Sequence, residues 1–166
     1  MLPQRINLIA YSTLAVIICY IDRVNISVAI IPMQEQFGWS DSQVGFIFSS
    51  FYLGYMLTMA LGGYLSDKFG GKRVLGWGVV LWSIFTILTP LAAHNGFFAL
   101  FFIRILMGIG EGVTFPAWHS LYARWIPFNE RTRAIAFTNS GVSIGTIIGY
   151  IGCLLYTSPS PRDLVI

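Results

Sequence analysis

The sequence predicts an all-α membrane protein that crosses the bilayer about five times. Hydrophobic residues make up 55% of its 166 residues and charged residues only 10%, and the mean hydropathy is +0.70. Soluble domains carry about 25% charged residues, so this chain has too few polar side chains to cover a surface in water. The strict alternation of a membrane β-strand is absent from the sequence, and long apolar runs take its place.

A membrane-spanning helix needs about 20 mainly apolar residues. Five segments meet or nearly meet this requirement, and we expect one transmembrane bundle over residues 1–152. The predicted helices are 7–31, 43–65, 74–93, 97–122 and 134–152.

The first predicted helix carries two adjacent charges, Asp22 and Arg23. A secretory signal peptide is a poor interpretation of this segment, because it is too long, contains these charges and lacks a small-residue cleavage site. The second helix begins near Ser40 or Asp41, short polar residues that can cap a helix N-terminus.

The connection between the second and third helices reads "GGYLSDKFGGKRVLG", residues 62–76. Since the third helix is expected to begin near Val74, the chain must turn within very few residues. Glycine permits such a turn.

The fourth helix contains "RILMGIGEGVTFPAWHS", residues 104–120. Arg104 and Glu111 lie seven residues apart, about two helical turns, and therefore share a face. Pro116 removes a backbone hydrogen bond and is expected to kink the helix. His119 is a candidate polar group, for which a structural hydrogen bond is favoured over proton transfer. Close packing of neighbouring helices is expected at glycines, here residues 108, 110, 112, 141, 145, 149 and 152.

Basic residues occur on one side of the predicted spans. Arg5 precedes the first helix, and the other Lys and Arg residues outside the spans, up to residue 152, lie in the second-to-third and fourth-to-fifth connections. The two remaining connections hold Glu35, Asp41 and His94. The positive-inside rule therefore predicts a multi-pass protein with a cytoplasmic N-terminus. The net charge of +3 reflects this orientation rather than a nucleic-acid-binding surface.

Four charges remain inside the spans: Asp22, Arg23, Arg104 and Glu111. Intramembrane ionisable residues usually face a cavity or one another. One interpretation is a non-transporting assembly or sensor protein, in which these charges only hold helices together. The other is an anion site, since arginine offers carboxylate or phosphate a planar fork of donors.

Within such a site, Glu111 is the better candidate proton carrier, because only Arg104 lies near it along its own helix. Asp22 could instead hold Arg23 in place or share the proton. An enzyme is not expected, because no nucleophile–base pair, metal-ligand spacing or nucleotide-binding loop is found, and no cofactor is indicated. Cys19 and Cys153 suggest neither a disulfide framework nor a metal site.

Residues 153–166 differ in character from the rest of the chain. The string "CLLYTSPSPRD" interrupts the fifth helix with two prolines and resembles one reading frame of a transposase-type sequencing adapter. We expect this segment to be a non-native tail, with the natural chain continuing past residue 152.

Three stretches together resemble a known family. "GGYLSDKFGGKRVL" (62–75) is similar to the loop signature of the major facilitator superfamily. With "YIDRVNISVAI" (20–30) and "RILMGIGEGVTFPAWHSLYARWIPFNERTRA" (104–134), it resembles the anion:cation symporter family. That family includes plastid phosphate transporters, sialin, vesicular glutamate transporters and bacterial sugar-acid transporters. The resemblance covers residues 5–152. It favours the plastid phosphate group over vesicular glutamate transporters, because those transporters carry a histidine in the second helix where this sequence has Phe48.

This resemblance implies a twelve-helix fold whose two halves rock around a central site by alternating access. The chain would supply most of the N-terminal half, and without its C-terminal half it would be inactive. The implied activity is H⁺- or Na⁺-coupled transport of a small organic or inorganic anion.

The resemblance also implies roles for individual residues. Arg23 and Arg104 match substrate-binding positions, and Asp22 and Glu111 match acids of proton coupling or site organisation. His119 matches a histidine of the sialin-like and glutamate-transporter groups. The cytoplasmic gate motif is matched by Gly63, Asp67, Gly70, Lys72 and Arg73.

Overall fold

The computed structural model describes residues 2–157, and this part of the chain is built from helices without a strand. The helices are α1 (Leu2–Phe37), α2 (Asp41–Phe69), α3 (Gly71–His94), α4 (Phe97–Gly112), α5 (Thr114–Trp125) and α6 (Phe128–Thr157). Five stretches are long and apolar enough to cross a membrane, with α4 and α5 together forming the fourth. The predicted all-α membrane fold with about five transmembrane helices is confirmed.

Most helices extend beyond the segments predicted for them. The predicted boundaries 7–31, 43–65, 74–93 and 134–152 all lie inside the observed helices. Apolar length locates only the part of a helix within the hydrocarbon, whereas the helix can continue outside it because its backbone bonds are local. Residues 153–157 likewise continue α6 beyond the predicted end at 152. The rest of the predicted non-native tail, 158–166, lies outside the described residues.

The fourth span was predicted as one helix, 97–122, and is divided at Val113 into α4 and α5. Pro116 explains the interruption, because it has no N–H for the carbonyl of Gly112, four residues earlier. Regular bonding resumes with Ala117 N–H, which donates to Val113 O at 3.0 Å.

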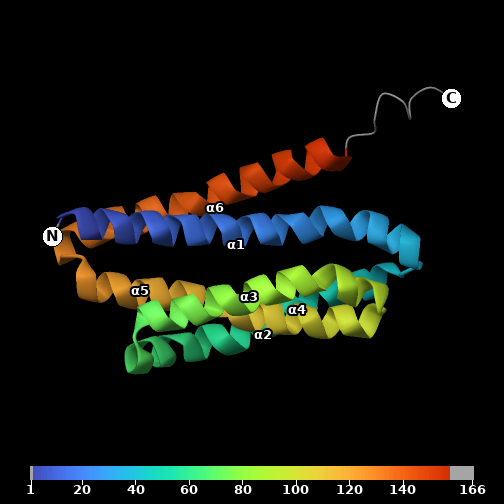
Figure 1. Ribbon diagram of the computed structural model, residues 1–166, viewed down its shortest axis with the longest axis horizontal. Coiled ribbons are helices and arrows are strands. Elements are labelled where there is room, and N and C mark those ends of the chain that lie inside the picture. Colours follow the sequence, from blue (N-terminus) through green and yellow to red (C-terminus); the bar gives the residue numbers. More distant parts are fainter. Residues whose placement is uncertain (1, 158–166) are drawn as a thin grey trace.

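The helices form two groups. α1 packs along α6, while α4 packs between α2 and α3. In Figure 1, α1 and α6 run side by side above the group formed by α2 to α5. Buried side chains of α4 therefore lie close to the boundary between the two groups.

Glycines bring the backbones of α2 and α4 together. A Cβ atom on Gly108 would overlap the backbone of Phe51, and one on Gly112 would overlap Tyr55. Gly141 and Gly145 of α6 likewise pack against α1, whereas Gly152 has open space around it. Close packing thus accounts for most of the glycines singled out in the sequence.

Gly70 forms the turn between α2 and α3. Its φ of 88° lies in the left-handed region, which glycine adopts without steric cost. The single residue between the two helices makes this the tight turn that the sequence indicated.

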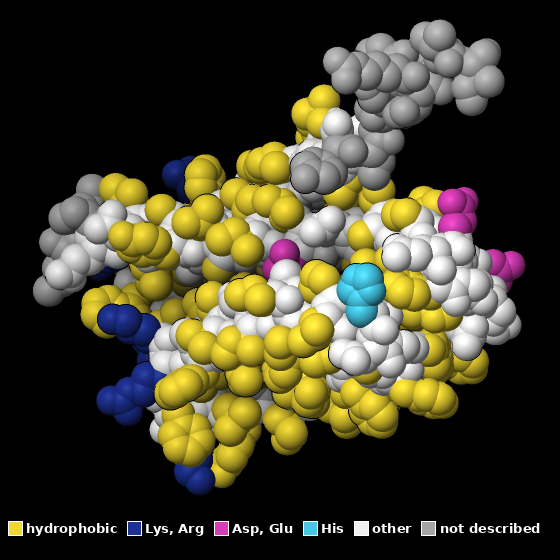
Figure 2. Space-filling model, turned by 45° about the vertical axis from the view of Figure 1, so that its right-hand side comes forward, with side chains coloured by type: hydrophobic (Ala, Val, Ile, Leu, Met, Phe, Trp, Pro, Cys, Tyr) yellow, Lys and Arg dark blue, Asp and Glu magenta, His cyan; other side chains and the backbone are white. Residues whose placement is uncertain are grey.

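Charged residues separate to the two ends of the bundle. In Figure 1, the start of α1, the α2–α3 turn and the α5–α6 connection lie at the same end. Figure 2 shows the visible Lys and Arg side chains towards one end of the face, and acidic side chains at the other end and near the middle. Large exposed hydrophobic side chains occur on every transmembrane helix, as contact with lipid requires.

Candidate functional site

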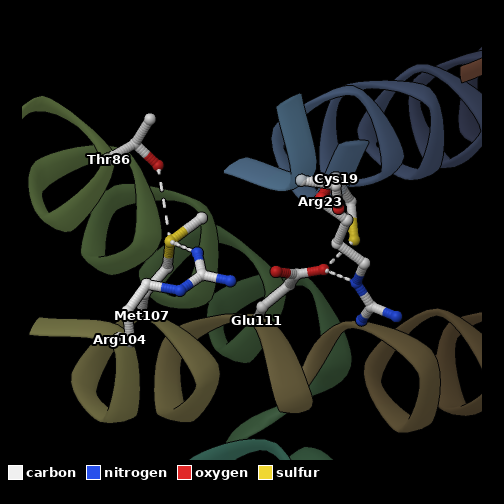
Figure 3. Close-up of polar contacts among 7 residues, drawn as sticks. Cys19, Arg23, Thr86, Arg104, Met107 and Glu111 are labelled. Atoms are coloured by element: carbon white, nitrogen blue, oxygen red, sulfur yellow. Dashed lines mark hydrogen bonds and ion pairs between the residues drawn. The ribbon is translucent and has the colours of Figure 1, made fainter. Parts of the chain in front are cut away.

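A buried ion pair joins α4 to α1. Glu111 is 1% exposed, and its Oε1 accepts a hydrogen bond from Arg23 Nε at 2.5 Å. The thiol of Cys19, one helical turn before Arg23, donates to the same oxygen. Figure 3 shows both α1 side chains meeting the Glu111 carboxylate. Charge-assisted hydrogen bonds of this kind are stronger than neutral ones.

Aromatic rings surround the Arg23 guanidinium. Its Cζ lies 4.9 Å from the ring centroid of Tyr20, 5.3 Å from that of Phe51 and 4.7 Å from that of Tyr55. A cation near the face of an aromatic ring is stabilised by the ring quadrupole. Residues from α1 and α2 therefore hold this guanidinium in place at the boundary between the helix groups.

The second intramembrane arginine, Arg104, is 3% exposed. Its Nη1 donates to Met107 Sδ at 3.3 Å, and its Cζ lies 4.9 Å from the Phe51 ring centroid. Figure 3 shows Met107 between Arg104 and Thr86 of α3, with the Arg104 guanidinium on the side of Met107 that faces Glu111. Phe51 is consequently in contact with both arginines, and the two guanidinium groups flank one aromatic side chain.

Asp22 faces a different side of α1 from Arg23. It lines a cavity of about 130 Å³ between α1, α3 and α4, together with Thr86 and Arg104. No ion pair between Asp22 and Arg23 is found within residues 2–157, because successive side chains on a helix point about 100° apart. In the structure, it is Glu111 rather than Asp22 that holds Arg23.

Several buried polar atoms of this region have no hydrogen-bond partner in the described part of the chain. They are Arg23 Nη2, Arg104 Nε and Glu111 Oε2. Buried polar groups are normally hydrogen-bonded, and each exception requires an explanation. The site therefore has two donors and one acceptor still able to bind.

The predicted cytoplasmic gate motif links α2 to α5. Ser120 Oγ donates to the Asp67 carboxylate at 3.2 Å, and Arg124 Nη2 donates to the Asp67 backbone carbonyl at 3.2 Å. Lys72 and Arg73 are exposed and make no ion pair with any residue that the structure describes.

Gly63 and His119 lie outside these contacts. No atom would meet a Cβ on Gly63 within 4 Å, whereas its neighbour Gly62 packs closely on Pro116. His119 is exposed on α5, and its ring stacks on Trp118 with centroids 3.8 Å apart. Within residues 2–157, no hydrogen bond or ion pair joins His119 to Arg23 or Glu111.

Sequence reasoning missed the neutral members of the site. Cys19, Phe51, Tyr55 and Met107 were not singled out, although Cys19 lies four residues before Arg23 and so shares its face. That spacing was a usable signal. No group of His, Cys, Asp and Glu suited to a metal ion is found among the described residues.

Fold and site together define a multi-pass α-helical membrane protein with two arginines and a buried carboxylate between its helices. The sequence profile of the Major Facilitator Superfamily matches residues 12–162. The chain belongs to this superfamily. Its members are transporters rather than enzymes, in agreement with the expectation from the sequence.

Similar proteins include three chloroplast proteins of plants. The chain is 49% identical to the probable anion transporter 4 of Oryza sativa subsp. japonica, over 89% of this chain and 25% of the relative. It is 48% identical to the ascorbate transporter of Arabidopsis thaliana, over 89% of this chain and 27% of that relative. It is 46% identical to the sodium-dependent phosphate transport protein 1 of Arabidopsis thaliana, over 89% of this chain and 29% of that relative.

The same fold occurs in a crystal structure of a bacterial homologue of the human lysosomal transporter Spinster, in an inward-facing and occupied conformation. That structure superposes with a TM-score of 0.82 and 26% sequence identity, covering 98% of this chain and 39% of the other. This chain thus spans less than a third of the curated relatives and about two-fifths of the solved structure.

Proposed function

We propose that this segment belongs to a longer secondary active transporter that moves small carboxylate or phosphate anions by alternating access. Movement of the anion is coupled to a H⁺ or Na⁺ gradient. The observation that carries the proposal is the pair of guanidinium groups between the helices, each with a buried nitrogen that has no partner within the described residues.

Arg23 and Arg104 are suited to holding an anion. Arginine stays charged when buried, and its planar fork matches carboxylate and phosphate oxygens. The two side chains come from different helices and flank Phe51. An anion bound by both would balance their charge in a region where an unpaired charge is costly.

Glu111 is the proposed proton carrier. Its carboxylate competes with an anion for Arg23, since Arg23 Nε bonds to Glu111 Oε1. A proton on Glu111 would neutralise the carboxylate and free the guanidinium for substrate. Asp22, beside Arg104 in the cavity between α1, α3 and α4, is the proposed second acid of coupling or site organisation.

The names of the similar proteins support this assignment. One is an ascorbate transporter and another a sodium-dependent phosphate transport protein, so both organic and inorganic anions are substrates to test. The gathering of Lys and Arg residues outside the spans at the end of the bundle that holds the start of α1 supports a cytoplasmic N-terminus. The motif Gly63, Asp67, Gly70, Lys72 and Arg73 is the proposed cytoplasmic gate.

Uptake into proteoliposomes tests the proposal with the full-length protein. Radiolabelled inorganic phosphate and ascorbate are supplied separately, each with an imposed pH gradient or an imposed Na⁺ gradient. We expect at least one gradient to drive concentrative uptake of at least one anion. With an effective pH gradient, Glu111→Gln should abolish proton-driven uptake while sparing exchange of the anion.

Two results would count against the proposal. Absence of uptake of both anions by folded protein, under both gradients, would contradict anion transport. Full proton-driven uptake by Glu111→Gln would contradict the role of this carboxyl while leaving anion transport intact.

A further inference from the structure

The buried thiol of Cys19 has a defined place in the charged site. Cys19 is 1% exposed and donates to Glu111 Oε1, the oxygen that also accepts from Arg23 Nε. Cys19 and Arg23 are one turn apart on α1, so a single helix face presents two donors to one oxygen. Neither the family assignment nor the proposed anion binding accounts for this second donor.

The other carboxylate oxygen is in a different situation. Glu111 Oε2 is buried and accepts no hydrogen bond from any described residue. Because Oε1 already accepts from a thiol and a guanidinium, a proton arriving at Glu111 meets less competition at Oε2. The contacts thus make the two oxygens of one carboxyl group chemically distinct.

We propose that Cys19 is a positioning residue for Glu111. Its thiol and Arg23 together hold Oε1, which directs proton uptake to Oε2 and fixes the carboxyl orientation. When a proton from the aqueous side adds to Oε2, the carboxyl group becomes neutral, Cys19 keeps its own proton, and the hold on Arg23 weakens. This inference rests on the proposed proton-carrying role of Glu111.

The charged and titratable groups around Glu111 come from several elements. Arg23 and Cys19 of α1 contact it directly, and Tyr55 of α2 lies over Arg23. Arg104 is on α4 itself, and Asp22 lines the neighbouring cavity with it. Cys19 is the uncharged donor in this set that bonds to the carboxylate, so its replacement changes one hydrogen bond without changing net charge.

The transport test compares four variants of the full-length protein by the pH dependence of phosphate or ascorbate uptake, whichever is transported. Hydrogen bonds to a charged carboxylate favour the charged form. Cys19→Ala and Cys19→Val remove the donor, and the midpoint of the pH profile should move by about one unit to higher pH. Cys19→Ser keeps a donor and should stay near the wild-type midpoint. Val16→Ala, a buried apolar change on the same helix, is the packing control and should also leave it unchanged.

Infrared spectroscopy tests the contact without relying on transport. The S–H stretching band of Cys19 is the band that disappears in Cys19→Ala. We expect this band to shift in Glu111→Gln, and to shift in the wild type as the Glu111 carboxyl group titrates. A Cys19 band unaffected by Glu111→Gln would overturn the proposal, as would a wild-type midpoint in folded Cys19→Ala. A midpoint that moves equally in Cys19→Ser would show that side-chain size, not hydrogen bonding, is responsible. Failure of wild-type uptake alone would instead count against the proposed function, and the infrared result would still decide the role of Cys19.

Discussion

Arg23 is held by more groups than any other charged residue within the membrane spans. It bonds to Glu111 through Nε and lies near the rings of Tyr20, Phe51 and Tyr55, yet its Nη2 has no partner among the described residues. A residue that only held helices together would have no need of a free donor. The combination of a fixed Nε and an available Nη2 suits a group that binds a second anion.

Replacing Arg23 by lysine separates these two roles. Lysine keeps the positive charge but loses the planar fork of donors, so Arg23→Lys should lower the kcat/KM of anion uptake by about tenfold or more. The measurement is initial uptake rate against anion concentration, together with the yield of folded protein. Arg5→Lys is the control, because Arg5 lies on the same helix and its ion pair with Glu130, at 3.7 Å, is at the surface and contributes little.

The alternative role for the charges predicts a different pattern. If Arg23→Ala and Arg104→Ala lower the folded yield but leave uptake per folded molecule intact, the charges hold helices together and do not bind the anion. A Spinster-like fold would then remain, with the anion site located elsewhere.

At the scale of the helices, glycines determine how closely α2 and α4 approach. Gly54 and Gly108 face the opposite backbone, where a Cβ on either residue would overlap main-chain atoms of the other helix. Such contact also sets the position of Phe51, and therefore of the ring between the two arginines. Helix packing and site geometry are coupled through these small residues.

Gly108→Ala should push α2 and α4 apart. The overlap is with the backbone of Phe51 and Tyr55, which cannot move aside as a flexible side chain could. Overpacking of this kind costs about 1–3 kcal/mol, and we expect a lower thermal unfolding midpoint in detergent. Gly45→Ala is the matched control in α2, because nothing lies within 4 Å of its added Cβ. A midpoint for Gly108→Ala equal to that of Gly45→Ala would show that the helices are not this close.

At the scale of the whole molecule, the charge distribution divides the bundle into two ends. Basic residues lie on the helix ends that flank the α2–α3 turn and the α5–α6 connection, where Asp67 and Glu130 also lie, whereas Asp41 begins α2 at the other end of the bundle (Figure 1). Successive helices cross the bilayer in alternating directions, so every second connection lies on the same side. The basic residues therefore lie at one end of the bundle because they flank alternate connections.

Labelling of single cysteines in bacterial cells tests the orientation. A membrane-impermeant maleimide should label Ser42→Cys in intact cells, and should label Asn129→Cys only after lysis, because the basic end is expected in the cytoplasm. Both positions are exposed. The background carries Cys153→Ala, and wild-type Cys19 is buried. Labelling of Asn129→Cys in intact cells with protection of Ser42→Cys would show the opposite orientation.

Sequence reasoning succeeded where a property depends on linear order. Apolar length predicts the number of spans. The missing Cβ of glycine predicts the turn at Gly70, and the missing N–H of proline predicts the interruption near Pro116. Helix ends were less accurate, as the extension of α1 to Phe37 shows, because hydropathy marks the bilayer-embedded part and not the full helix.

The contacts of the candidate site followed from the sequence only in part. Asp22, Arg23, Arg104 and Glu111 were identified because charges are conspicuous in apolar segments. Which of these charges contact one another was not predicted. Asp22 was one suggested partner of Arg23, but it lies on another side of the helix.

By itself, the sequence determined that this protein spans a membrane with about five helices, which charges lie inside the spans, and which loops are basic. These are consequences of composition and order along the chain. Only the tertiary structure decided that Glu111 meets Arg23 and Cys19, that Arg104 lies by Met107, and that Phe51 contacts both arginines. The reason is that each contact depends on how the helices are rotated and how closely they approach, and close packing of several helices at once sets both.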